Sequence, residues 1–210
     1  MKISRHKVFI SYYHKDDQIY KNELINYAFF NFENGKYESI FEDYSVNDGD
    51  IDDTNMSSEQ IRRKIRDEYI KDATVLILLC GKNTKYRKHI DWEIHAAMYD
   101  SEENPQMGII VINLPSINQN VRVSCDEEKE IVCPNSTWRS INSRKEFEES
   151  YPYMPDRIID NFEKHVPITV VDWSVIHNKS MSLMKLIDNA YNRRKDINYD
   201  HSRPLRRRNS

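Results

Sequence analysis

The chain has 210 residues with 31 basic and 34 acidic side chains, and its formal net charge of −3 excludes a general nucleic-acid-binding protein. Its length suits one domain with a sizeable core, and only four glycines favour helices and sheet over a loop-rich scaffold. Three cysteines without metal-ligand spacing, and the lack of any apolar run long enough for a membrane span, predict a cytoplasmic protein without a disulfide framework, metal centre or membrane contact.

Short apolar runs alternate along the chain with segments whose apolar residues recur every three to four positions. Each run is too short for a buried helix and is closed by polar residues, Gly or Pro, which predicts a strand. The expected strands cover about residues 7–12, 39–43, 74–80, 108–113 and 168–172. Strands that alternate with helices in this way predict an α/β, flavodoxin-like fold with a central parallel five-stranded sheet and helices on both faces.

The expected helices have recognisable starts and apolar stripes. Asp16 or Asp17 can cap the first helix, and Ser57 with Gln60 forms a capping box for the second. Two further helices are expected at about 155–165 and 179–194. The first helix is expected to face the protein core with the apolar stripe of Tyr20, Leu24, Tyr27 and Ala28.

Residues 44–55 form a polar, acidic loop after the second expected strand. Aligning Gly49 with the glycine of an EF-hand loop places Tyr44 and Val46 where oxygen ligands belong, so the calcium-site interpretation fails. Two interpretations stay open, a mobile recognition loop and a merely solvated one.

The second half of the chain contains an elaboration at 116–167. Alternating apolar residues on either side of an acidic run predict a hairpin at about 121–133. The sequence loses its periodicity after the last helix, which predicts a single domain over 1–195 and a disordered basic tail over 196–210.

The helix that follows the third strand carries the strongest candidate for chemistry. Ile90, Ile94, Ala97 and Met98 form its apolar stripe, and Glu93 lies beside that stripe. A carboxylate near the carboxyl end of a strand lies where open α/β sheets bind ligands. The alternative is that Glu93 is an acid favoured by the dipole of its helix.

Several activities of α/β proteins lack their motifs in this chain. There is no GxxxxGK[ST] phosphate loop, no GxGxxG after the first strand and no GxSxG nucleophile elbow. A phosphoryl-accepting receiver domain needs an Asp at the end of strand three, where this chain has Cys80 and Gly81.

Four segments, in order and properly spaced, resemble the sequence boxes of the TIR domain. They are KVFISYYHKDD, FEDYSVNDG, VLILLCGKNT and HIDWEIHAA. More narrowly, they resemble the TIR-like proteins of bacterial Thoeris anti-phage defence systems. The resemblance covers about residues 5–114, and the last strand and helix are consistent with it.

The resemblance implies an NAD⁺-cleaving enzyme of the glycohydrolase or cyclase type, with NAD⁺ as substrate and no other cofactor. Glu93 matches the family's catalytic glutamate, while His89 stands where the family has Trp, with Trp92 close by. Residues implied in substrate binding are Ser11, Tyr12, Tyr13, His14, Asp43, Ser45, His89 and Trp92.

The resemblance also implies partners. A phage component would trigger synthesis of a cyclic ADP-ribose isomer, and this diffusible second messenger would activate a separate effector that depletes NAD⁺. The alternative is a non-catalytic TIR scaffold or sensor that acts by self-association through the loop after the second strand.

Overall fold

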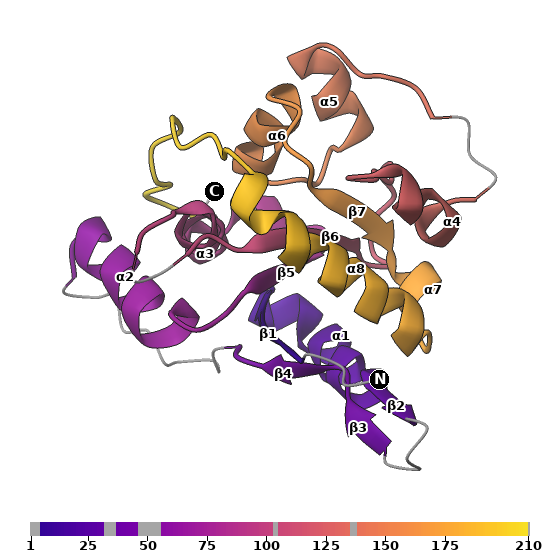
Figure 1. The fold of residues 1–210 in the computed structure, drawn as a ribbon. Coiled ribbons are helices and arrows are strands. Elements are labelled where there is room, and N and C mark those ends of the chain that lie inside the picture. The colour runs from indigo at the N-terminus through magenta and orange to yellow at the C-terminus, as the bar shows by residue number, and fades with distance from the viewer. Residues whose placement is uncertain (1–4, 32–36, 46–55, 103–104, 135–137, 210) are drawn as a thin grey trace.

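The computed structural model describes residues 5–31, 37–45, 56–102, 105–134 and 138–209, and their fold is drawn in Figure 1. Five strands form a parallel sheet in the order β4-β1-β5-β6-β7. The strands are β1 (His6–Ser11), β4 (Phe41–Asp43), β5 (Val75–Cys80), β6 (Gly108–Asn113) and β7 (Thr169–Asp172). The predicted parallel sheet is confirmed, and β5 lies at its centre as an unbroken buried run should.

The second expected strand divides at Ile40. Its first part, β3 (Tyr37–Ser39), pairs antiparallel with β2 (Phe29–Asn31), and only β4 joins the main sheet beside β1. The Ile40 N–H donates to the carbonyl of Ala28 at 2.8 Å, and Ser39 Oγ donates to the carbonyl of Phe41 at 2.7 Å. These bonds fix a bend between β3 and β4 that periodicity does not reveal.

Helices cover both faces of the sheet, and Figure 1 shows α8 lying across one of them. They are α1 (His14–Tyr27), α2 (Ser58–Lys64), α3 (Lys88–Met98), α4 (Lys129–Val132), α5 (Arg144–Ser150), α6 (Asp156–Glu163), α7 (Trp173–Ile176) and α8 (Ser180–Arg193). A π-helical turn, η1 (Ile65–Ile70), continues α2. The predicted capping box is confirmed, since Gln60 N–H donates to Ser57 Oγ and Ser57 N–H donates to Gln60 Oε1. Helix α1 begins at His14, so Asp16 and Asp17 lie in its first turn and do not cap it.

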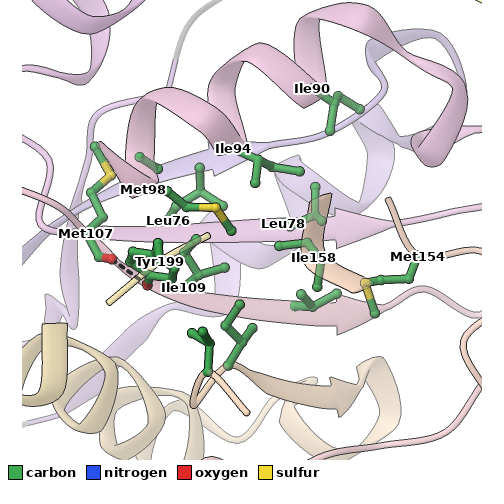
Figure 2. Packing of buried hydrophobic residues seen from close by; sticks show 14 of the residues in the cluster. Leu76, Leu78, Ile90, Ile94, Met98, Met107, Ile109, Met154, Ile158 and Tyr199 are labelled. Atoms are coloured by element: carbon green, nitrogen blue, oxygen red, sulfur yellow. Dashed lines mark hydrogen bonds between the residues drawn. The ribbon is translucent and has the colours of Figure 1, made fainter. Parts of the chain in front are cut away.

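Alternate residues of the central strands pack into two separate hydrophobic cores, one on each face of the sheet. Leu76 and Leu78 point toward α3 and α6, whereas Val75, Ile77 and Leu79 pack with α1 and α8. In Figure 2 the side chains of α3 lie directly over those two leucines. The predicted apolar stripe of α3 is buried. Its burial fixes the orientation of the helix about its own axis, and therefore the direction in which its polar residues point.

Gly108, the first residue of β6, allows α8 to approach the sheet closely. A Cβ at this position would lie 2.2 Å from the carbonyl oxygen of Ala190, a backbone atom that cannot rotate away. We therefore expect Gly108→Ala to lower the free energy of unfolding by roughly 2–3 kcal/mol, measured by urea denaturation.

Gly81→Ala is the matched control for this substitution. The nearest atoms to its Cβ would be the two carboxylate oxygens of Asp17 at 2.7 Å and its Cγ at 3.0 Å, which belong to the end of a side chain. A loss as large as that of Gly108→Ala would show that steric contact with α8 is not what selects glycine in β6.

The predicted hairpin at 121–133 is wrong. Residues 126–132 are helical (η3, Asp126–Glu128, then α4), and only Arg122 forms a bridge, to Val170. The physical reason is Glu128, which is fully buried and needs hydrogen-bond donors. Its carboxylate accepts from Ser124 Oγ at 2.8 Å, from Thr169 Oγ1 at 2.6 Å and from Arg193 Nη2 at 2.7 Å.

The prediction of a disordered tail is also wrong for residues 196–209. Ile197 and Tyr199 are buried, and the Tyr199 hydroxyl donates to the carbonyl of Met107 at 2.8 Å (Figure 2). We call residues 197–209 the brace segment, because they lie against α3 and α6. Across the described ranges, no helix has both the length and the apolar character needed to cross a membrane.

Candidate functional site

The site lies where the order of the strands reverses. From β1 the sheet continues to β4 on one side and to β5 on the other, and ligands of open α/β sheets bind outside the carboxyl ends of strands at such a switch point. Ser11 ends β1, and Glu93 lies in α3, which follows β5. The fold therefore brings together a hydroxyl and a carboxylate that are 82 positions apart in sequence.

Glu93 is held by a direct hydrogen bond from Ser11. Ser11 Oγ donates to Glu93 Oε2 at 2.6 Å, and the glutamate is only 9% exposed. Burial raises the pKa of Glu93 to about 7, and the bond from Ser11 opposes that rise because it favours the charged form. A carboxyl group with such a pKa changes its charge near neutral pH.

The raised pKa of Glu93 predicts a pH-dependent stability. The folded chain binds this proton more tightly than the unfolded chain does, so the free energy of unfolding falls as the pH rises from about 4.5 to about 7. Glu93→Gln removes the buried charge, and we expect it to stabilise the protein at pH 8 by up to about 3 kcal/mol, but not at pH 4. Thermal melts across this range test the prediction, with the exposed Glu149→Gln as control; an equal shift at every pH would contradict it.

The end of β4 is tied to β1 beside this pair. Ser45 Oγ accepts the N–H of Ile10 at 3.0 Å, and Asp43 Oδ1 accepts both the N–H and the hydroxyl of Ser45. Lys21 Nζ lies 3.2 Å from Asp43 Oδ2. Asp43 and Ser45 thus lie next to the strand that carries Ser11, while residues 46–55 of the expected recognition loop lie outside the described part of the chain.

The residues after β1 divide between the two faces of the sheet. Tyr13 packs against the core on the α3 face, and the Arg87 guanidinium lies 4.0 Å from the centre of its ring. Tyr12 is buried on the opposite face, where it stacks on His14 at 4.3 Å and donates to Gln18 Oε1. Of the tyrosines proposed to bind substrate, Tyr13 therefore shares the face of Glu93 and Tyr12 does not.

His89 and Trp92 lie together near the start of α3, with ring centres 5.0 Å apart. Trp92 is only 2% exposed, and its Nε1–H donates to the carbonyl of Arg206 at 2.9 Å. His89 is half-buried and precedes Glu93 by one helical turn. The indole is thus used in packing against the brace segment, and His89 lies one turn before Glu93 in the same helix.

The brace segment fixes the amino end of α3. Arg157 of α6 is fully buried, forms a bidentate pair with Asp91 at 2.9 and 3.2 Å, and donates to the carbonyls of Arg203 and Pro204. The N–H of Arg206 also donates to Asp91, at 2.8 Å. These bonds anchor the helix turn that precedes Glu93.

Asp17, which its sequence position offers only as a possible helix cap, is a second buried carboxylate at this edge of the sheet. It is 3% exposed, its Oδ2 has no hydrogen-bond partner in the described structure, and its carboxylate lies against Gly81 at the end of β5. Burial raises its pKa to about 6, and the neighbouring Asp16 adds to the rise. An acid in a first helical turn is common, so the sequence carries no signal for this placement.

The described residues contain no group of three or more His, Cys, Asp or Glu side chains that could hold a metal ion. The three cysteines are free. The switch point offers a buried carboxylate that accepts a hydroxyl hydrogen bond and ionises near neutral pH, with the ring of Tyr13 after β1 and the guanidinium of Arg87 before α3 on the same face of the sheet. This arrangement suits the stabilisation of developing positive charge.

The strand order β4-β1-β5-β6-β7 is that of a flavodoxin-like α/β domain. The family model described as Thoeris protein ThsB, TIR-like domain, matches residues 9–119, just over half of the chain, and the chain belongs to this family. The TIR domains of the activated Roq1 resistosome, which directly recognizes the pathogen effector XopQ, are a structural neighbour at 13% identity and a TM-score of 0.42, covering 88% of this chain and 98% of that one. The comparison with curated proteins gives no match.

Proposed function

We propose that this TIR-like domain cleaves NAD⁺ at the bond between nicotinamide and ribose, with Glu93 as the catalytic residue. The observation that carries the proposal is the buried Glu93 carboxylate, fixed by Ser11 at the switch point of the sheet. Substrate contacts are proposed for Tyr13, Asp43, Ser45 and the other residues that the family resemblance implies.

The chemistry needs little beyond one well-placed anion. As the bond from ribose C1′ to the nicotinamide nitrogen breaks, its electron pair leaves with nicotinamide and the ribose becomes oxocarbenium-like. A fixed carboxylate faces this positive charge in the transition state and is already oriented for it. Nicotinamide leaves as a neutral ring, so no general acid has to protonate it.

The fate of the ribose depends on the attacking group. Attack by water gives ADP-ribose, whereas attack by a hydroxyl or a nitrogen of the same molecule gives a cyclic isomer of ADP-ribose. The proposed reaction is the cyclisation. Its product would be a messenger that is made in the cytoplasm after a phage component triggers the enzyme, and that activates an NAD⁺-depleting effector. Purified protein incubated with NAD⁺, with products separated by chromatography, distinguishes the two.

The ionisation of Glu93 predicts the pH dependence of this reaction. Only the charged carboxylate stabilises the oxocarbenium ion, so kcat/KM for NAD⁺ is expected to rise with pH and level off above the pKa of about 7. The rise should approach tenfold per pH unit on the acid side. Initial rates between pH 5 and 9 measure it, and a flat profile over that range would exclude Glu93 as the titrating group.

A further inference from the structure

A cavity of about 480 Å³ lies at the far edge of the sheet, next to β7, and its walls come from the elaboration at 116–167. We propose that this cavity binds a small anionic ligand with an aromatic ring, of the size of a mononucleotide. Its walls are residues 120–123, the segment from Trp138 to Asn142, Phe147 of helix α5, and Tyr151 and His165. The volume falls within the usual range for small-molecule sites.

The charge on the cavity wall has one sign. Arg122 and Arg139 line it, His165 adds a third nitrogen-bearing side chain, and no carboxylate is present among the described lining residues. The whole chain, in contrast, carries more acidic than basic residues. The charged side chains among the described lining residues are basic, so the cavity favours an anion over a cation, while Glu128 and Glu146 interact with Arg122 and Arg139 from outside the lining.

Arg122 is held at the wall by two contacts. Its Nη1 donates to the carbonyl of Ile168 at 2.7 Å, and its guanidinium lies 4.7 Å from the centre of the Phe162 ring. A guanidinium has five N–H donors in a rigid plane, which suits a phosphate group. Because the side chain is already fixed, it loses little conformational entropy when an anion binds.

Aromatic side chains supply the other half of the recognition. Trp138, Phe147 and Tyr151 line the same cavity as the two arginines. Trp138 is half-buried, as expected for a ring with a face available to a ligand. An aromatic ring beside a fixed guanidinium such as that of Arg122 suits a nucleotide, through base stacking and phosphate contacts.

The cavity is distinct from the Glu93 site. It lies beyond β7, and two strands, β5 and β6, separate β7 from β1, which carries Ser11. The proposal therefore goes beyond NAD⁺ cleavage, and it holds or fails independently of Glu93.

Tryptophan fluorescence of the full chain carrying Glu93→Gln measures binding without turnover at the other site. Trp92 and Trp173 are 2% and 6% exposed, so a change on adding ligand is expected to come from Trp138 and to vanish in Trp138→Phe. AMP and UMP are the probes. Adenosine, which lacks the phosphate, and pyrophosphate, which lacks the aromatic ring, are the controls. We expect saturable quenching by AMP and UMP, and binding at least tenfold weaker for adenosine and pyrophosphate.

Charge reversal at one residue that lines the cavity and at one that does not supplies the matched variants. Arg139→Glu at the cavity should weaken AMP binding about tenfold or more, whereas Lys145→Glu, exposed outside the cavity, should leave it within about twofold. The proposal is overturned if AMP and UMP leave the Trp138 emission unchanged, if pyrophosphate binds as tightly as AMP, or if both variants weaken binding equally.

Discussion

Glu93→Gln is expected to abolish the production of the cyclic messenger while the protein stays folded. Glutamine keeps the shape of the side chain and can still accept the hydrogen bond from Ser11, so only the charge is lost. A preorganised group that faces developing charge typically supplies about 3–4 kcal/mol, which corresponds to roughly two to three decades of rate. The direct measurement is NAD⁺ consumption by purified protein, and extract from infected cells applied to the effector tests the messenger.

Two controls separate catalysis from folding in this experiment. Glu149→Gln makes the same chemical change on the exposed side of α5 and should not alter the rate. Ser11→Ala leaves the charge of Glu93 but removes its donor, so an intermediate loss is expected, with the acid limb of the pH profile moved to higher pH. If extract from Glu93→Gln cells activates the effector as wild type does, catalysis by Glu93 is refuted.

Arg157→Ala is expected to cause the largest loss of stability, about 3–5 kcal/mol, because it leaves the buried Asp91 carboxylate without its bidentate partner. The same change frees the carbonyls of Arg203 and Pro204 from their donor. The brace segment and the start of α3 should loosen together. Urea denaturation gives the energy, and amide hydrogen exchange in α3 shows where protection is lost.

Arg63→Ala is the matched control, because it removes an arginine from an exposed pair with Glu59 in α2. An exposed pair of this kind contributes about 0–1 kcal/mol. Equal losses in the two variants would show that burial of the Arg157–Asp91 pair does not determine its effect.

The sheet could be predicted because its strands are buried on both faces. A run such as Val75–Cys80 has no polar residue and is bounded by polar residues or Gly. Its short length therefore indicates a buried strand, and its flanking residues give the bounds of that strand. The position of Glu93 followed from the same logic, since the apolar stripe of α3 fixes the rotation of the helix and the strand order fixes its place.

The brace segment and the buried Glu128 could not be predicted, since polar contacts between distant parts of the chain leave no periodic pattern. The brace is held largely by backbone carbonyls, to which Arg157 and Trp92 donate, and any residue type can supply a carbonyl. In the sequence, Glu128 is one acid of a run that predicts exposure. In the structure, Thr169 and Arg193 donate hydrogen bonds to its buried carboxylate. Trp92 likewise lies next to Glu93 in sequence, but faces the brace segment.

The brace also orders events during synthesis. The N–H of Lys88, at the start of α3, donates to Asn209 Oδ1, a contact that spans 121 positions of the chain. At ordinary translation speeds α3 leaves the ribosome on the order of ten seconds before residue 209 does. A nascent chain that already contains the whole family-matched region, residues 9–119, therefore still lacks the contacts that anchor the first turn of the Glu93 helix. Completion of the site is delayed until the brace segment has been made.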